Sequence, residues 1–162
     1  EIRKSLKGLT SSGFINDLSV IFNSAFIMSK VQLGDSTVRQ SSNRPMQGQS
    51  PYIINMGLSY RNMLHDLQVD LLYNVAGKYI FSIGFDVYPD IYQMPRNLID
   101  LTVNKGLGKH FKLKAGISDL LNNQVLLLQD ANNDGRFEAT VDQVIQRYLP
   151  GTTYTFGISY RL

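Results

Sequence analysis

Apolar and polar residues alternate with a period of two along much of this chain, and this alternation restricts the possible fold more than any other feature. Successive side chains of a β-strand point to opposite faces of a sheet, so the pattern predicts strands with one apolar and one polar face. Seven segments show it, the first two with interruptions: 2–9, 18–28, 52–60, 67–75, 99–103, 111–117 and 153–162. The sequence therefore predicts an all-β fold with seven antiparallel strands.

The connections between these segments alternate in length. The short ones are Thr10–Asn16, Arg61–Asp66 and Gly106–Gly108. The long ones are Val31–Ser50, Gly77–Arg96 and Leu121–Gly151. Outer-membrane barrels have short periplasmic turns and long extracellular loops, whereas a soluble meander has no reason to sort its connections. A proline, which suits the start of a strand because it lacks the ladder N–H, precedes each strand after a long connection: Pro51, Pro95 and Pro150.

The tightest connection predicts a strand register. Gly106-Leu107-Gly108 suits a three-residue hairpin loop, because glycine readily adopts a left-handed conformation. This loop pairs Lys105 with Lys109, Val103 with Phe111, Leu101 with Leu113, Thr102 with Lys112, and Asp100 with Lys114. We expect Asp70 of the neighbouring strand to join Asp100 and Lys114 in a charge ladder.

The alternation is compatible with lipid or with a protein core on the apolar side. Aromatic residues at strand ends, charges in the middle of the opposite face and sorted connections favour lipid. The polar face then lines the lumen, and its predicted members are Asn55, Asp70, Asn74, Asp100, Thr102, Lys112, Lys114 and Arg161. A soluble, lipocalin-like ligand-binding barrel with its faces exchanged is the alternative.

Seven strands do not close a barrel with both termini in the periplasm, which needs an even number. An open sheet in lipid would leave the N–H and C=O groups of its edges unpaired. The chain opens at Glu1-Ile2-Arg3, in what is predicted to be the middle of a strand. We expect residues 1–162 to be the C-terminal part of a larger barrel, with a complete eight-stranded adhesin or structural barrel as the alternative.

Four stretches resemble the C-terminal end of TonB-dependent outer-membrane receptors of the Bacteroidetes type, in the family order. They are residues 44–55 (RPMQGQSPYIIN), 72–78 (LYNVAGK), 95–101 (PRNLIDL) and 116–122 (GISDLLN). The resemblance implies a 22-stranded barrel in a Gram-negative outer membrane, of which these are the last seven strands. It also implies an N-terminal plug and import driven by TonB, and it leaves a surface lipoprotein partner open.

The C-terminal strand departs from the barrel pattern at its last residue. Barrel proteins often end in an aromatic residue, whereas this chain ends in Leu162. We expect Tyr160 to act as the last aromatic anchor instead. The predicted signal for the barrel-assembly machinery is Tyr154, Phe156, Ile158, Tyr160 and Leu162, and its deletion should abolish membrane insertion.

No constellation typical of an enzyme or cofactor site is present in the sequence. The two histidines, His65 and His110, fall at short turns without acidic partners. There are no cysteines, and a net charge of +3 without a dense basic cluster gives no reason to expect a nucleic-acid partner. The prediction is a protein that is not an enzyme and has no cofactor or metal.

Two features of the long connections suggest ligands. Asp130-Ala131-Asn132-Asn133-Asp134-Gly135 matches the first half of a calcium loop, but the twelfth position is Val141 rather than Glu. A hairpin turn between strands 125–129 and 141–148 is the favoured interpretation. Four aromatic residues suit stacking on a sugar or aromatic cargo, although packing within the loops is the favoured interpretation for each: Tyr79, Phe81, Tyr88 and Tyr92.

Overall fold

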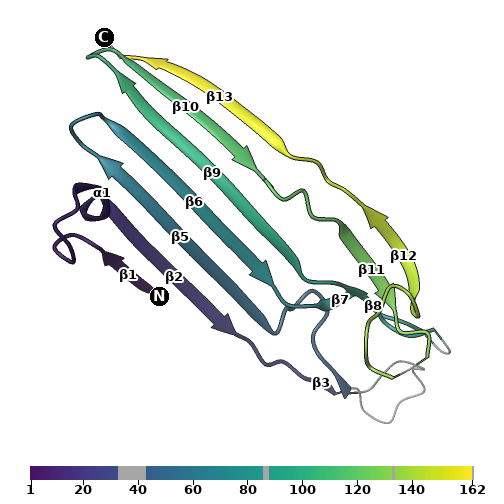
Figure 1. Cartoon of the computed structure of the whole chain (residues 1–162). Helices are drawn as coiled ribbons and strands as arrows, with labels where there is room; N and C mark the ends of the chain where they lie inside the picture. The colour runs from purple at the N-terminus through teal and green to yellow at the C-terminus, as the bar shows by residue number, and fades with distance from the viewer. Residues whose placement is uncertain (33–42, 86–87, 133, 162) are drawn as a thin grey trace.

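The chain folds into one large antiparallel sheet with a smaller sheet at one end of it (Figure 1). This computed structural model describes residues 1–32, 43–85, 88–132 and 134–161. The large sheet has the strand order β1-β2-β5-β6-β9-β10-β13. Its strands are Ile2–Ser5, Leu18–Phe26, Tyr52–Asn62, Leu67–Ala76, Arg96–Leu107, Phe111–Ser118 and Thr153–Tyr160. The predicted seven antiparallel strands are confirmed.

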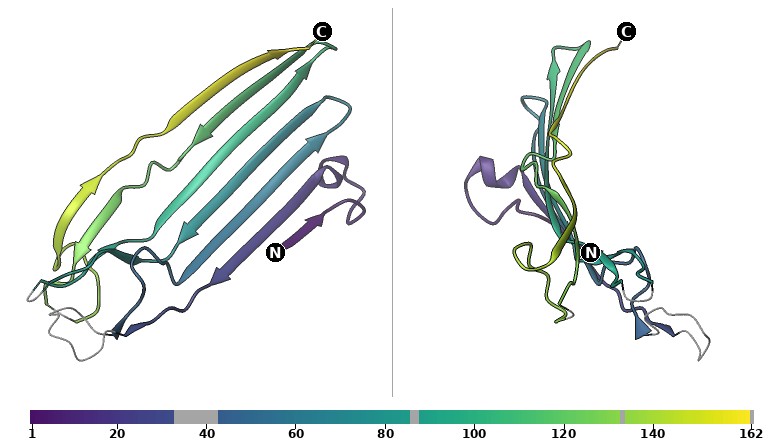
Figure 2. Two further views of the ribbon diagram at one scale, coloured as in Figure 1. Left: turned by 180° about the vertical axis from the view of Figure 1, so that it is seen from behind. Right: turned by 90° about the vertical axis from the view of Figure 1, so that its right-hand side faces the viewer.

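The strands follow one another along the chain as a simple meander, so each pairs with its sequence neighbours in the sheet. Seen edge-on, they form a single curved layer (Figure 2). The short turns and the end of β13 lie toward one end, the first residues of β1 lie beside the middle of β2, and the long connections lie toward the other end (Figure 1). We call these the turn end and the loop end.

The register between β9 and β10 differs from the predicted one. Ala115 lies opposite Val103 and Lys114 opposite Asn104, and the turn is formed by residues 108–110. Lys114 therefore does not face Asp100, which lies opposite Leu72 of β6, and the predicted charge ladder is wrong. The difference of four residues is even, so every side chain keeps its predicted face.

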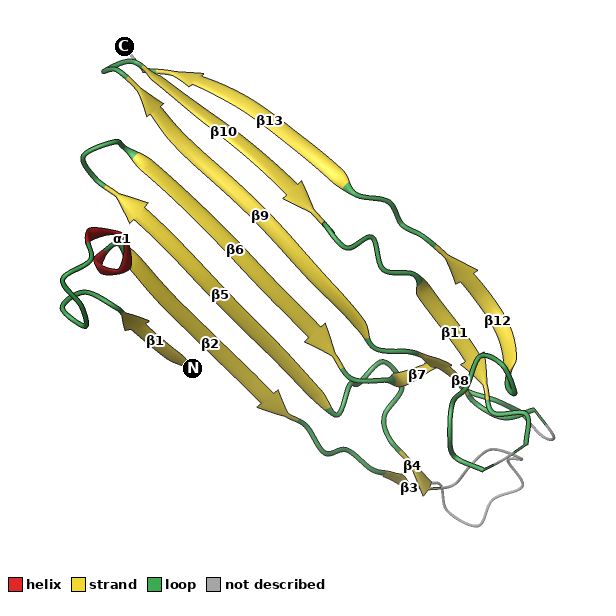
Figure 3. Ribbon diagram, in the orientation of Figure 1, coloured by secondary structure: helices red, strands yellow, loops and turns green. Residues whose placement is uncertain are grey.

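The long connections carry short strands that were not predicted there, apart from the hairpin of the third connection. The second and third connections form a four-stranded sheet ordered β12-β11-β8-β7, and the first holds the two-stranded ribbon β3-β4 (Figure 3). The four-stranded sheet consists of Tyr79–Ser82 (β7), Ile91–Gln93 (β8), Val125–Gln129 (β11) and Gln143–Tyr148 (β12). The ribbon consists of Val31–Gln32 (β3) and Asn43–Arg44 (β4). The hairpin predicted around residues 130–135 is confirmed by β11 and β12.

The turn end differs from the prediction in two ways. The first strand ends at Ser5 instead of Leu9, and the connection that follows contains a one-turn helix, α1 (Gly13–Asn16). No helix of the described residues is long and apolar enough to cross a membrane.

Buried apolar side chains gather at the loop end of the molecule. The described core residues are Val75, Ile80, Val125, Leu127 and Leu128. The wall of the large sheet contains almost none of them because it is one layer thick, and a single layer covers neither of its own faces. The side chains of β13 illustrate this: Tyr154 is 76% exposed and Phe156 is 71% exposed.

The observed register predicts which cysteine pairs cross-link. Directly opposed residues of an antiparallel pair have Cβ atoms about 4.5–5.5 Å apart. The double variant Val103→Cys/Ala115→Cys should form a disulfide under mild oxidation, measured as a mobility shift without reductant. Val103→Cys/Phe111→Cys, matched to the predicted register, separates the sulfurs by about 13 Å along the strand and should not. Efficient cross-linking of the second pair alone would contradict the structure.

Candidate functional site: two sheet faces and a loop-end assembly

The predicted polar residues share one face of the large sheet. The register from β5 to β10 places Asn55, Asp70, Asn74, Asp100, Thr102, Lys112 and Lys114 there. Arg161 follows the last strand, where its backbone N–H donates to the carbonyl of His110 at 2.8 Å. That this face lines a lumen stays a prediction.

Hydrogen bonds connect side chains of the polar face. The Asn74 amide donates to Asn55 Oδ1 across β5 and β6 at 2.6 Å. The Asp70 carboxylate accepts from the Ser59 hydroxyl at 2.6 Å and from the Gln68 amide at 2.8 Å. The Asn55–Asn74 and Ser59–Asp70 bonds cross between β5 and β6 and support their register, whereas the Gln68–Asp70 bond lies within β6.

An apolar hollow interrupts the polar face near its centre. Ile21, Leu72 and Leu98 line it together with Gly57, and its volume is about 370 Å³. A Cβ added at Gly57 would lie 3.1 Å from Leu72 Cδ2 and 3.5 Å from Ile21 Cβ, so the missing side chain leaves room for both neighbours. The period-two alternation did not predict this hollow. Its apolar residues lie at positions where the alternation predicts polar ones.

The opposite face carries aromatic residues at both ends of the strands. At the turn end, Phe14 stacks on Tyr60 with ring centroids 5.0 Å apart, and Phe111 lies 5.0 Å from Tyr160. Toward the loop end, the register places Phe26 opposite Tyr52, and Tyr154 opposite Ile117. Mostly aliphatic residues lie between these two aromatic rows.

The predicted assembly signal belongs to this apolar face. Tyr154, Phe156, Ile158 and Tyr160 alternate along β13 and are all more than half exposed. Leu162, its last predicted member, lies outside the described residues. Two lysines also fall on this face by register, Lys4 and Lys105. The ammonium of Lys105 donates to the carbonyl of His65 in the turn, so its charged group reaches the end of the strand.

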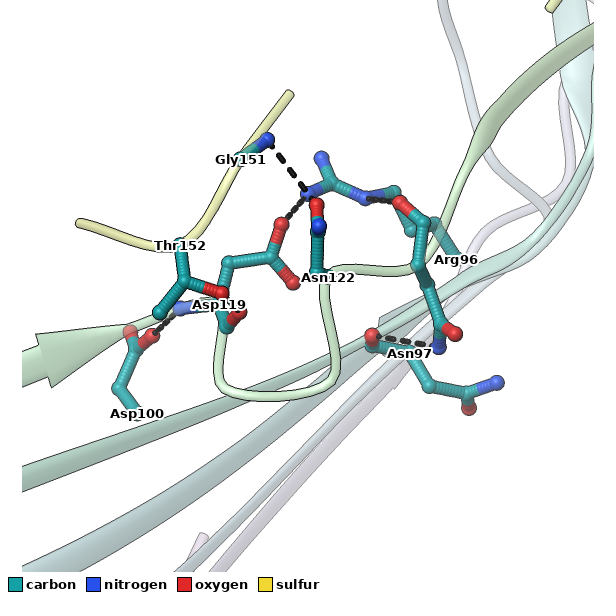
Figure 4. Close-up of polar contacts among 8 residues, drawn as sticks. Arg96, Asn97, Asp100, Asp119, Asn122, Gly151 and Thr152 are labelled. Carbon is teal, nitrogen blue, oxygen red and sulfur yellow. Dashed lines mark hydrogen bonds and ion pairs between the residues drawn. The ribbon is translucent and has the colours of Figure 1, made fainter. Parts of the chain in front are cut away.

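The four-stranded sheet, the ribbon β3-β4 and the loops between their strands form what we call the loop-end assembly. A cluster of polar side chains joins the large sheet to it (Figure 4). We call it the junction cluster: Arg96, Asp100, Asp119, Asn122 and Asn123. It lies where β10 stops before β11, and the chain turns there through two left-handed residues, Asp119 (φ 56°) and Asn122 (φ 45°). Asp and Asn tolerate this conformation better than other non-glycine residues.

Arg96 is the centre of this cluster. Its guanidinium forms an ion pair with Asp119, and Arg96 Nε donates to the carbonyl of Asn123 at 2.9 Å. The side chains of Arg96 and Asp119 are 20% and 11% exposed, so water screens their charges only weakly. The pair fixes the segment after β10 to the first residue of β9.

Further hydrogen bonds attach the other strands to the same segment. The Asp100 carboxylate accepts from the backbone N–H of Asp119 at 2.8 Å, and the Asn122 side chain accepts from the N–H of Gly151 at 3.0 Å. The Thr152 hydroxyl donates to the carbonyl of Asp119 at 2.9 Å. The junction cluster therefore holds β9, β10 and the segment before β13 together. Asp100 takes part in this cluster instead of the predicted pair with Lys114.

The calcium-like loop satisfies its own carboxylates. Asp130 accepts from the backbone N–H groups of Asp134 (3.2 Å) and Gly135 (2.8 Å), and Gly135 has a φ of 76°. Asn133 of the motif lies outside the described residues. Within the described ranges, no three His, Cys, Asp or Glu side chains are grouped as metal ligands. These contacts are those of a turn.

The histidines lie at the turn end. His65 Nδ1 is 2.9 Å from Asn62 Oδ1, and His110 Nδ1 is 3.0 Å from the carbonyl of Arg161. Each imidazole ring therefore has a polar contact within or beside its turn.

A cavity of about 450 Å³ lies at the loop end, and we call it the loop-end cavity. Two of the four predicted aromatic residues line it, Tyr79 and Tyr92, beside Ile27, Pro51, Lys78 and Ile80. Phe81 and Tyr88 are not part of its lining and are 49% and 70% exposed. Burial raises the pKa of the Tyr92 hydroxyl, and the charges of Asp90 and Asp130 raise it further. The hydroxyl therefore stays protonated at neutral pH.

Removal of the Asp119 charge should loosen the junction cluster. Asp119→Asn keeps a residue that tolerates the left-handed conformation, and we expect a loss of about 1.5–3 kcal/mol because Arg96 loses its partner. Asp119→Ala should lose about 1 kcal/mol more through backbone strain. Urea unfolding of the protein in lipid, followed by circular dichroism, measures both. Glu1→Gln, in an exposed pair with Arg3 at 4.0 Å, is the control; an equal loss there would contradict this account.

Comparisons with known proteins give no relative for this chain. No family model, no curated protein and no solved structure matches it. The functional conclusion therefore depends on the residues and geometry of the chain itself.

Proposed function

We propose that this chain forms part of the wall of an outer-membrane β-barrel. One observation carries the proposal: a single-layer sheet has an uncovered apolar face with aromatic rows at both ends. Outer-membrane barrels have an outward apolar band about 25 Å tall between two aromatic girdles. In β5, Tyr52 and Tyr60 are eight residues apart, which corresponds to about 27 Å along a strand. At a strand tilt of about 40° this becomes about 21 Å of membrane thickness.

The opposite face and the edges support the same proposal. The polar face carries charged and amide side chains in mid-strand, which suits a water-filled or protein-filled interior. Both edge strands, β1 and β13, have only one partner within the described sheet. Since unpaired backbone groups are costly in lipid, the proposal includes further strands that close the barrel. A soluble barrel would instead turn the aromatic rows inward, around a core.

We further propose that the barrel belongs to a TonB-dependent receptor that imports a nutrient across the outer membrane of a Gram-negative bacterium. The support is the resemblance of four segments, two of which, 95–101 and 116–122, meet in the junction cluster. In this proposal an N-terminal plug lies against the polar face, and the loop-end assembly faces the cell exterior. TonB supplies the energy through the plug.

Charged substitutions should distinguish the two faces of the wall. Met56 lies on the apolar face midway between Tyr52 and Tyr60, and Asn55 precedes it on the polar face. Met56→Arg in the full-length protein should cost about 2–4 kcal/mol, because arginine at the bilayer midplane is unfavourable. The fraction of heat-modifiable barrel in isolated outer membranes measures this. Asn55→Arg, the matched control, should assemble normally; the reverse ranking would refute the membrane wall.

A second comparison tests the receptor assignment separately from the wall. Cells that lack TonB should retain the assembled barrel, because assembly does not need TonB, but should lose growth on the imported nutrient. Normal growth without TonB, with the barrel present, would contradict the receptor proposal and leave the wall intact.

A further inference from the structure

The loop-end cavity combines an apolar lining with one positive charge. Its volume of about 450 Å³ is within the range of small-molecule sites, which are mostly apolar with a few placed polar groups. Ile27, Pro51 and Ile80 supply aliphatic surface, and Tyr79 and Tyr92 supply aromatic surface. Lys78 is the only charged side chain in the described lining.

The Lys78 ammonium is held over aromatic rings. Its Nζ lies 4.0 Å from the ring centroid of Phe137 and 5.6 Å from that of Tyr92. Cation–π contacts of this kind position a cation without neutralising it. Within the described parts of the chain, the ion pairs are Arg3 with Glu1 and Arg96 with Asp119, so no described carboxylate pairs with Lys78.

The two carboxylates whose charges act on Tyr92 are occupied elsewhere. Asp90 accepts from the backbone N–H of Gly84 at 2.7 Å. Asp130 accepts the N–H groups of Asp134 and Gly135 within its own turn. Within the described parts of the chain, neither carboxylate forms an ion pair with the half-buried Lys78.

The other polar groups of the lining argue against a sugar. The Tyr79 hydroxyl donates to Gln93 at 2.7 Å, and the Ser29 hydroxyl accepts from the N–H of Met46 at 3.0 Å. A sugar would bring several hydroxyl groups to this surface, where Gln49 Oε1 is the one buried side-chain acceptor of the described lining without a partner. Each further buried hydroxyl without a partner is costly. An apolar body with one charged group leaves no such groups unpaired.

We propose that the loop-end cavity binds a small amphipathic anion, with its apolar body against the tyrosines and aliphatic residues and its carboxylate at Lys78. The inference rests on the proposed function only for its biological role as a cargo site. The binding itself depends on the described cavity and is measured without transport.

Three probes of similar shape test the charge class. Full-length protein in lipid nanodiscs, without detergent, is titrated calorimetrically with 3-phenylpropanoate, its neutral amide and 3-phenylpropylamine. We expect the carboxylate to bind at least tenfold more tightly than the amide, because a charge-assisted contact is lost, and the amine not to bind. Equal binding of the carboxylate and the amide, or no binding of the carboxylate, would overturn the proposal.

Substitutions assign the binding to this cavity. Lys78→Met should weaken 3-phenylpropanoate at least tenfold and leave the amide unchanged, and Lys78→Arg should restore the preference for the anion. Ile27→Trp, which fills the cavity, should weaken both probes. Lys30→Met is the matched control, because it removes an equal charge nearby from a residue outside the lining. If Lys30→Met has the same effect as Lys78→Met, the proposal is wrong.

Failure of this proposal is distinguishable from failure of the wall. Each nanodisc sample is first checked for heat-modifiable mobility, which reports an assembled barrel. An assembled barrel that does not discriminate the probes contradicts the cavity assignment alone. A chain that never assembles in lipid contradicts the proposed function.

Discussion

Backbone pairing between neighbouring strands holds the large sheet together. Because this pairing leaves both faces of the sheet uncovered, the stability of the sheet depends on what surrounds each face. An antiparallel meander satisfies the N–H and C=O groups of its inner strands but covers neither face. One face is mostly apolar, and the aromatic side chains of β13 are more than half exposed. Water is a poor solvent for such a face, because buried apolar surface stabilises a fold by about 25 cal/mol per Å². Lipid on one side and a polar interior on the other suit both faces.

The loop end is not a single layer, so its apolar side chains cover one another. There, short strands pack around Ile80, Leu127 and Leu128, and the molecule has a small core of its own. The junction cluster connects this assembly to the wall through Arg96 and Asp119. This connection positions the loop-end cavity relative to the lumen of the proposed barrel, where the proposed receptor would need a cargo-facing surface.

The sequence predicted the strands and faces of the wall because the period-two alternation encodes both directly. It did not predict the β9–β10 register, because any shift by an even number of residues preserves the faces. The glycine that forms the turn is Gly108, with a φ of 66°. Gly106 lies in the strand instead, where a Cβ would collide with the Asp66 side chain and its N–H donates to the carbonyl of Asp66. That contact joins the end of β9 to the turn between β5 and β6, which is far away in the sequence.

The polar residues of the candidate site show the same limit. Asn55 and Asn74 were predictable as members of one face, and their hydrogen bond follows from the pairing of β5 with β6. The junction cluster was not predicted, because Arg96 and Asp119 meet only after β9 and β10 have paired. Their one local signal is the presence of Asp119 and Asn122 at positions that require a left-handed backbone. The short strands β7 and β8 are too brief to show a period.

The most direct measurement of the central claim is the depth of the apolar face in a bilayer. Residues 1–162 contain no tryptophan, so in a protein whose other tryptophans are replaced by phenylalanine, Met56→Trp and Tyr60→Trp each supply a single tryptophan. In lipids brominated at the chain centre, Met56→Trp should be quenched strongly and Tyr60→Trp weakly, and lipids brominated near the headgroup should reverse this order. A tryptophan at position 56 that no brominated lipid quenches would show that this face does not contact lipid.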